Sequence, residues 1–213
     1  MMMFYQWLEK RCQRPLPGRE AHRRFVPNVP DAHKRLSDAP IDAKQSAVLI
    51  PLIADESQEL GVLFTVRSEA LRSHKGQISF PGGRLDLGET HVEAAVREAH
   101  EEISITSAHV QVLGTLSPLY IPPSNSAVTP VIAAVKHQSS WHISTAEVAE
   151  VVIHPLRDFL TDTIFEERAG IIPNLPISVP MWDVHPTIPL WGATAMMLNE
   201  VVMLYNEFLL EGS

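Results

Sequence analysis

Short apolar runs dominate the chain from Ala47 onward. Residues 47–53 are Ala-Val-Leu-Ile-Pro-Leu-Ile, and residues 62–66 are Val-Leu-Phe-Thr-Val. Runs that are apolar at almost every position predict strands that are covered on both faces of a sheet. Similar patterns predict further strands over residues 78–80, 110–116, 128–135 and 148–153, and a hairpin formed by residues 165–172 and 177–182.

Helical spacing of apolar residues appears in two long segments, residues 90–103 and about 193–210. Shorter helices are expected over residues 3–14 and 155–160. Strands followed by a helix, then more strands and a closing helix, predict a mixed α+β (α/β) sandwich. This order does not fit a regular βαβ repeat, and neither a Gly-x-Gly-x-x-Gly motif nor a P-loop motif is present.

Residues 1–44 form a separate arm, and residues 45–213 form the domain. The arm contains nine Lys and Arg residues against five acidic residues, a local charge of +4, so the rest of the chain carries −12. Its prolines at positions 15, 17, 27, 30 and 40 predict extended pieces. Four apolar side chains of the arm need cover, namely Phe4, Trp7, Leu8 and Phe25. Either the arm packs on its own domain, or a second copy covers it in a homodimer.

Composition and charge indicate a globular protein and exclude several other classes. The chain has 213 residues, 45% hydrophobic and 20% charged, as a globular protein has. A net charge of −8 argues against a general nucleic-acid binder. The single Cys12 excludes an intrachain disulfide and a cysteine-based zinc site. The longest apolar stretch, residues 188–210, is interrupted by polar residues, and the N-terminus does not resemble a secretory signal. We therefore expect a cytoplasmic protein without membrane contact.

The helix predicted over residues 90–103 has negative charges at its disfavoured end. It begins with a capping box from Thr90 to Glu93. Glu98, Glu101 and Glu102 stand at i, i+3 and i+4 near its C-terminus, where the helix dipole disfavours anions by roughly 0.3–1 kcal/mol each. A solvated acidic face is one interpretation. The other is a site for a hard divalent cation, Mg²⁺ or Mn²⁺, which prefers clustered carboxylates.

The segment before this helix favours the metal site. Gly82-Gly83 lets the backbone approach a ligand closely, and the Gly83 carbonyl could face the metal. Glu89 could orient Arg97 on the helix. The whole run has Gly83, Glu89, Arg97-Glu98-Ala99, Glu101-Glu102 and Ser104-Ile105 at fixed spacings.

This run resembles the Nudix box, the 23-residue signature of the Nudix hydrolases, which residues 83–105 match in length. One position departs from the pattern, because Ser104 stands where the pattern has glycine. Ser104 follows the helix, where the chain commonly turns left-handed, so serine should cost about 1 kcal/mol there. It removes no metal ligand. The resemblance implies a Nudix-type α/β/α sandwich with a mixed sheet, and metal-dependent hydrolysis of a diphosphate bonded to another group.

A narrower resemblance lies upstream of the box. Residues 63–68 and 71–86 are similar to the signature of the coenzyme A diphosphatase branch, and residues 47–52 and 191–195 are also similar to that branch. The resemblance implies cleavage of coenzyme A, or a derivative of it, to 3′,5′-ADP and 4′-phosphopantetheine. Four of the eight Lys and Arg residues beyond residue 44 lie between residues 67 and 84, as suits phosphate binding. The substrate-binding candidates are Arg67, Arg72, His74, Lys75 and Arg84, with Phe80 packed beneath the site.

The general base is left open among three carboxylates. Glu101 belongs to the box, and Glu147 and Glu150 lie on the approach to a later strand. We favour Glu150 of the latter two. Two further hypotheses compete with the coenzyme A reading: a Nudix hydrolase of another substrate, such as a dinucleotide or a nucleoside triphosphate, and a non-hydrolytic module that binds a nucleotide or acyl-coenzyme A. Only Ser104 and the basic arm motivate the last hypothesis.

Overall fold

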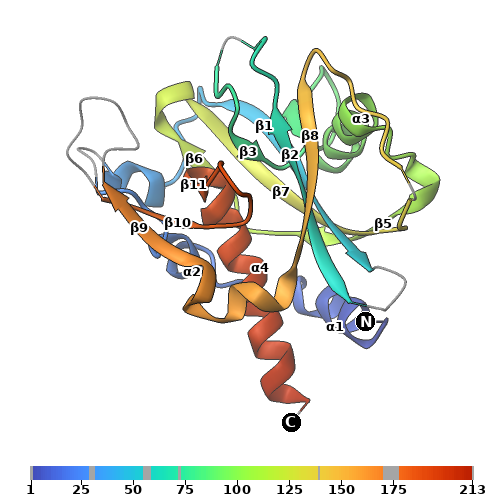
Figure 1. Ribbon diagram of the computed structural model, residues 1–213, viewed down its shortest axis with the longest axis vertical. Coiled ribbons are helices and arrows are strands. Elements are labelled where there is room, and N and C mark those ends of the chain that lie inside the picture. The colour runs from blue at the N-terminus through green and yellow to red at the C-terminus, as the bar shows by residue number, and fades with distance from the viewer. Residues whose placement is uncertain are drawn as a thin grey trace.

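The unbroken apolar run of residues 47–53 forms the centre of the main sheet. In the computed structural model, which describes residues 2–28, 32–54, 59–71, 73–138, 140–169 and 178–212, β1 (Lys44–Ala54) lies between β2 (Leu60–Arg67) and β7 (Ser126–Val135). It is antiparallel to β2 and parallel to β7, so the sheet is mixed (Figure 1). The remaining strands of this sheet are β3 (Ile78–Ser79), β4 (Gly82–Arg84), β5 (Val110–Thr115), β6 (Leu119–Ile121) and β8 (Val148–Pro155).

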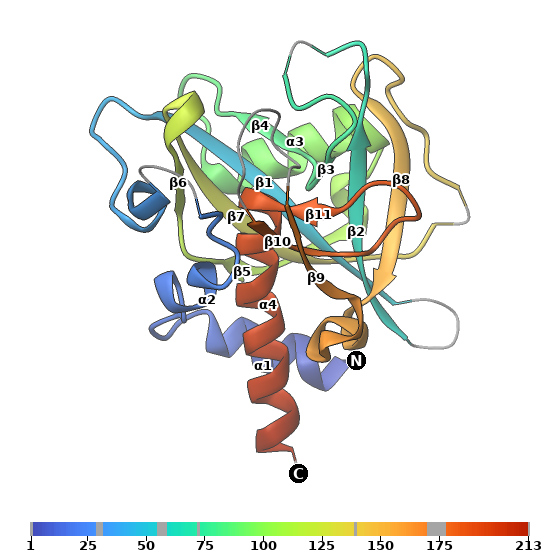
Figure 2. The same cartoon turned by 60° about the vertical axis from the view of Figure 1, so that its left-hand side comes forward.

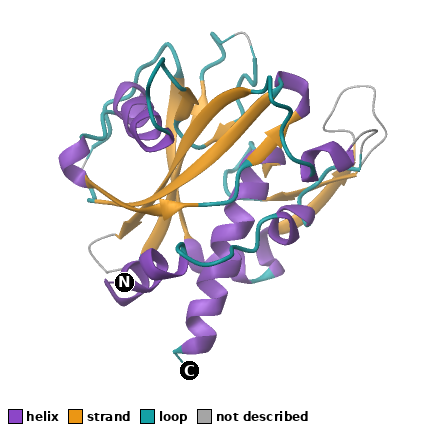
Figure 3. Cartoon of the chain, turned by 180° about the vertical axis from the view of Figure 1, so that it is seen from behind, coloured by secondary structure: helices purple, strands orange, loops and turns teal. Residues whose placement is uncertain are grey.

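Alternating side chains of β1 build two separate cores. Leu49 and Ile53 belong to the core beneath α3 (His91–Ile103), and Ile50 and Leu52 belong to the core beneath α4 (Gly192–Glu211). Successive strand residues point to opposite faces, so a strand covered on both sides must be apolar throughout. Figures 2 and 3 show the two helices on opposite sides of the sheet. The predicted α/β/α sandwich with a mixed sheet is therefore confirmed.

A second, three-stranded sheet consists of β9 (Phe165–Ala169), β10 (Ser178–Trp182) and β11 (Leu190–Trp191). β9 and β10 pair antiparallel, as the hairpin pattern predicted; residues 170–177 lie outside the described residues. β10 and β11 pack against α4. The short helix expected near Pro155 is a 3₁₀ helix over Leu156–Leu160, and similar single turns occupy Ser107–His109, Pro122–Ser124 and Asp162–Ile164.

The N-terminal arm is more helical than its prolines predict. It contains α1 (Met2–Arg11), α2 (Arg19–Arg23) and a 3₁₀ helix, η1 (Ala32–Leu36). The expectation of extended pieces is therefore wrong for α2 and η1. Pro15 and Pro17 precede α2, where a missing backbone N–H breaks no helical hydrogen bond.

The arm packs on its own domain. Phe4, Leu8 and Phe25 are at most 1% exposed and belong to the core beneath α4. The Phe4 ring lies 5.1 Å from that of Phe208, a residue of α4, and Figure 2 shows α1 beside this helix. Because the chain itself buries these three side chains and packs Trp7 against the same core, the homodimer loses the reason for which it was expected. Among the helices of the described residues, none is both long and apolar enough to span a membrane.

Both ends of α3 follow the local sequence. The Thr90 hydroxyl accepts a hydrogen bond from the Glu93 amide (3.3 Å), and the Glu93 carboxylate accepts one from the Thr90 amide (2.8 Å), which confirms the capping box. Ser104 ends the helix in the left-handed region, with φ 58° and ψ 31°. Ser104 therefore adopts the left-handed conformation that the glycine of the box pattern would adopt at this position.

Candidate active site

Two glycines allow the loop before α3 to lie close to its neighbours. Gly82 and Gly83 pair with Val48 and Ala47 of β1. A Cβ atom on Gly82 would lie only 2.6 Å from the Val48 Cα, and a Cβ atom on Gly83 would collide with the Glu98 carboxylate. The loop backbone can therefore contact both the sheet and the acidic side of α3 only without side chains at these positions.

Arg97 lies at the centre of the acidic cluster, by which we mean Glu89, Glu98, Glu101 and Glu102. Its Nε and Nη2 atoms donate to the two carboxylate oxygens of Glu89 at 2.9 and 3.0 Å, so the contact expected between these residues is present and bidentate. Its Nη1 atom donates to Glu98 (2.9 Å) and Glu101 (3.3 Å), and Nη2 also donates to the Arg84 carbonyl (3.0 Å). The hydrogen bonds to Glu89 raise the pKa of Arg97, and in return they lower the pKa of Glu89. This pair stays ionised and holds the loop on the helix.

The carboxylates of Glu98 and Glu102, next to this pair, are partly or fully buried. Glu102 is 2% exposed, and its burial raises the pKa of its carboxyl to about 8, although the positive charge of Arg67 opposes the rise. The negative charges of Glu98 and Glu147 add to it. Burial also raises the pKa of Glu98, against the effect of Arg97. Without a further cation these carboxyl groups are not all ionised at neutral pH.

The donor set fits a hard divalent cation. The Glu102 Oε2 atom is buried without a hydrogen-bond partner, and Glu98 lies against the Gly83 backbone. Within the ranges that the structure describes, however, no three acidic, imidazole or thiol side chains already converge as a finished metal centre. Arg97 holds Glu98 and Glu101 instead. Each of these two contacts uses one carboxylate oxygen, which leaves the second oxygen of Glu98 and of Glu101 as a donor for an ion.

A cavity of about 500 Å³ begins beside this cluster. Arg67 and Gly82 lie in its wall, and Arg67 is the cation that acts on buried Glu102. Most of the lining is apolar and comes from the sheet, from the start of α4 and from the arm. A more open hollow of about 760 Å³ runs along α3 past Glu93 and His100. Glu98 and Glu102 line neither of the two. We take the smaller cavity as the substrate site because it is more enclosed and because Arg67 and Gly82 in its wall connect it to buried Glu102.

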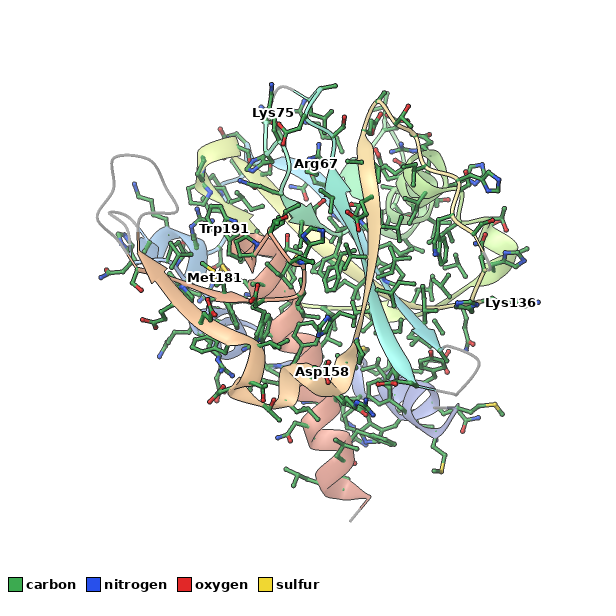
Figure 4. The ribbon with its side chains drawn as sticks, in the orientation of Figure 1. Arg67, Lys75, Lys136, Asp158, Met181 and Trp191 are labelled. Atoms are coloured by element: carbon green, nitrogen blue, oxygen red, sulfur yellow. The ribbon has the colours of Figure 1, made fainter. Side chains whose placement is uncertain are left out.

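The structure separates the predicted phosphate-binding residues. Arg67, His74 and Phe80 line the cavity, and the Phe80 ring stacks on that of Phe64 at 5.1 Å. Lys75 and Arg84 are exposed and do not line it. Figure 4 places Lys75 at the outer end of its loop and Arg67 nearer the sheet. Arg72 lies outside the described residues.

The two candidate bases near β8 face different partners. Glu150 pairs across the strand with Val66, and its carboxylate lies 3.3 Å from His185 Nε2. Glu147, one residue before β8, contributes a negative charge that acts on both Glu98 and Glu102. The acidic cluster is therefore electrostatically coupled to Glu147, while Glu150 has a partner of its own.

Sequence reasoning missed the part of the cavity that distant segments supply. Pro27 and Arg35 come from the arm, and Trp191, Thr194 and Met197 come from the end of the chain. The similarity at residues 191–195 was the one signal for the latter group. No local pattern distinguishes Arg35 from the other arginines of the arm.

The Nudix domain family matches residues 43–175, and the chain belongs to this family of hydrolases. It is 29% identical over 221 residues to Nudix hydrolase 3 of Caenorhabditis elegans, covering 92% of this chain and 89% of that protein. It is 44% identical over 173 residues to an uncharacterized Nudix hydrolase, NudL, of Pectobacterium atrosepticum, covering 77% and 84% of the two chains.

Solved structures agree on the fold. The Nudix hydrolase RenU of M. smegmatis has a TM-score of 0.53 and 20% sequence identity, covering 78% of this chain and 87% of RenU. A mutT/nudix family protein from Listeria innocua has a TM-score of 0.51 and 20% identity, covering 81% and 99%. The chain is thus a Nudix hydrolase, an enzyme of a family that generally uses divalent cations and acts on small nucleotide diphosphates.

Proposed function

We propose that this Nudix hydrolase cleaves the diphosphate of coenzyme A, or of a coenzyme A derivative, to 3′,5′-ADP and 4′-phosphopantetheine. One observation carries the proposal. The segment that resembles the coenzyme A diphosphatase signature contributes His74, Gln77 and Phe80 to the wall of the cavity, and that wall continues to Gly82 beside the glutamates. Part of the segment that resembles the branch by sequence is therefore placed where it would touch the substrate.

In this proposal Glu98, Glu101 and Glu102 hold Mg²⁺ or Mn²⁺, with the Gly83 carbonyl as a further ligand. The bound ion supplies positive charge for the diphosphate and makes water more acidic. Arg67 binds a diphosphate oxygen from the opposite side, which suits its position between the cavity and Glu102.

Glu89 and Arg97 act as positioning residues, because their bidentate contact fixes the loop on the helix that carries the other glutamates. Lys75 and Arg84 stand outside the cavity wall and belong to the proposal only as flanking charges. Arg72 stays a candidate from sequence alone.

A carboxylate must also accept the proton of the attacking water. Glu101 is half exposed and reaches Arg97 only at 3.3 Å, which leaves it free to move. Glu147 lies within electrostatic reach of the cluster. We assign the base to one of these two ahead of Glu150, which is engaged with His185.

The test is mass spectrometry of coenzyme A incubated with the protein and Mg²⁺, Mn²⁺ or EDTA, with ADP-ribose and NADH in parallel. We expect metal-dependent formation of 3′,5′-ADP and 4′-phosphopantetheine. Glu98→Gln and Glu102→Gln should abolish it, while Glu9→Gln, the same change at an exposed site in α1, should not. Faster cleavage of the comparison compounds would replace coenzyme A by another Nudix substrate. Full turnover by either active-site variant would refute the metal assignment.

A further inference from the structure

Arg35 is an arginine of the arm that lines the cavity. It belongs to η1, upstream of the residues 43–175 that match the family, and it shares the cavity wall with Pro27 and Pro123. Its side chain is half-buried, and that burial lowers the pKa of its guanidinium. No carboxylate among the described residues pairs with it.

Three of the five other arginines of the arm have acidic partners, and the remaining two, Arg14 and Arg23, are exposed to water. Arg11 contacts Glu207 at 2.8 Å, Arg19 contacts Asp38 and Arg24 contacts Asp162 at 2.6 Å. A partly desolvated guanidinium without an anion is unfavourable, because burial of a charge costs free energy unless the charge is paired. Such a departure from local stability is expected at a functional site.

The cavity separates Arg35 from Arg67. Arg67 ends β2, whereas η1 packs on β6, and β6 pairs with β7 on the far side of β1. Two interstrand spacings lie between β2 and β7, on the order of 10 Å. Between the two cations the wall is apolar, with Val48, Val128 and Met197. One ligand could thus meet a cation at each end and an apolar surface between them.

We propose that Arg35 binds a second phosphate group of the substrate, separate from the diphosphate that is cleaved. For coenzyme A this group is the 3′-phosphate of the adenosine, and this inference rests on the proposed function. Arg67 then serves the diphosphate and Arg35 serves the remote phosphate. The arm, which lies outside the family's domain, thereby determines which nucleotide is preferred.

The experiment compares kcat/KM for coenzyme A with kcat/KM for dephospho-coenzyme A, which lacks only the 3′-phosphate. Arg35→Gln should lower the value for coenzyme A roughly 10- to 100-fold, as the loss of one charge-assisted contact does. It should change the value for dephospho-coenzyme A little, so the preference for coenzyme A should fall by the same factor. Both substrates are measured on one preparation, so the ratio does not depend on the fraction of folded enzyme.

Two further variants sharpen the result. Arg35→Lys keeps the charge and should retain most of the preference. Arg23→Gln makes the same substitution at an exposed position of α2 outside the cavity and should leave the ratio unchanged. An unchanged ratio in Arg35→Gln, or an equal loss on both substrates, would overturn the role of Arg35 and leave the proposed function standing. Wild-type enzyme that does not cleave coenzyme A at all would overturn the proposed function, and the phosphate assignment with it.

Discussion

Glu200 is a buried carboxylate that ties the arm to the domain, and its replacement by glutamine makes a sharp test of that connection. The side chain is 0% exposed within α4. It accepts hydrogen bonds from the Gly18 amide (2.8 Å), the Ser117 amide (3.0 Å) and the Ser117 hydroxyl (2.7 Å). His22 Nε2 lies 3.7 Å away, too far for a good hydrogen bond, and it would attract the carboxylate only as a protonated imidazole. Three segments of the chain therefore meet at one carboxylate.

The expected cost follows from the count of donors. A glutamine has one acceptor oxygen, and its NH₂ group faces whichever donors the second carboxylate oxygen served. At least one buried donor is left without a partner, which costs about 1–3 kcal/mol. Loss of the charge at the remaining contacts raises the total to roughly 2–4 kcal/mol. That is a large fraction of the 5–15 kcal/mol, roughly, by which a domain is stable.

The loss should depend on pH. Burial acts to raise the pKa of Glu200, but the interactions with His22, Ser117 and Gly18 outweigh it, and the net pKa is lowered. A carboxyl group with a lowered folded pKa stabilises the protein above its unfolded pKa, near about 4.3, and this contribution is lost as the pH falls through the folded value. The difference between wild type and Glu200→Gln should therefore be full at pH 7 and shrink below about pH 4.

Urea unfolding at pH 7 and at acidic pH measures this difference. Glu207→Gln is the matched control, because it makes the same change on the same helix at a partly buried pair with Arg11. The Glu207 carboxylate keeps access to water, so a smaller cost of about 1 kcal/mol is expected. The reasoning fails if Glu200→Gln destabilises no more than Glu207→Gln at pH 7. It also fails if the gap between wild type and Glu200→Gln stays constant as the pH falls.

Three shorter predictions concern the carboxylates of the site and the residue that ends α3. The pKa of Glu102 in the folded protein is about 8, above its unfolded value, so the stabilising contribution of this group to the metal-free protein is full below about pH 4 and is lost as the pH rises through 8. Mg²⁺ binds the ionised carboxylates, so it should raise the melting temperature more at pH 8 than at pH 5.5. Equal shifts at the two pH values would contradict the assignment of Glu102 as a metal ligand. Glu147→Gln should lower kcat by roughly 10²–10⁴-fold if it is the base, and Glu150→Gln should not, as steady-state kinetics will decide. Ser104→Gly should raise the free energy of unfolding by about 0.5–1 kcal/mol without changing kcat, and a loss of activity would show that Ser104 does more than turn the chain.

Sequence patterns predicted the features of the structure that depend on residues close together in the chain. The capping box from Thr90 to Glu93, the left-handed residue after α3 and the apolar strands all follow from neighbouring residues, and the structure has them. The bidentate contact of Glu89 with Arg97 could be expected for the same reason, because a loop and one helix hold both residues. The observed ends of the strands differ from the predicted ends by only a few residues, as for β1, which was predicted over residues 47–53 and spans Lys44–Ala54.

The arm could not be predicted in this way. Its helices α1 and α2 pack against α4, which lies more than 150 residues downstream, so α1 alone gives no reason for Phe4 to be buried. Arg35 is one arginine among several until the cavity is known. The placement of Glu147 and Glu150 depends on an irregularity in the pairing of β2 with β8, where Val66 pairs with Glu150 but Arg67 pairs with Val148. Such a bulge redirects side chains, and the sequence carries no periodic sign of it.

The arm and the domain share one core, and this determines how the function of the arm can be tested. Deleting it would expose the core that Phe4, Leu8 and Phe25 help to form, and would leave Glu200 without Gly18. A truncated protein that failed to cleave coenzyme A would then report lost folding as readily as lost recognition. Arg35 contributes to the cavity wall but has no acidic partner among the residues described. Its substitution breaks no ion pair among those residues, so we expect it to change recognition with little effect on the packing of the arm. The substrate ratio then addresses the question that deletion cannot answer.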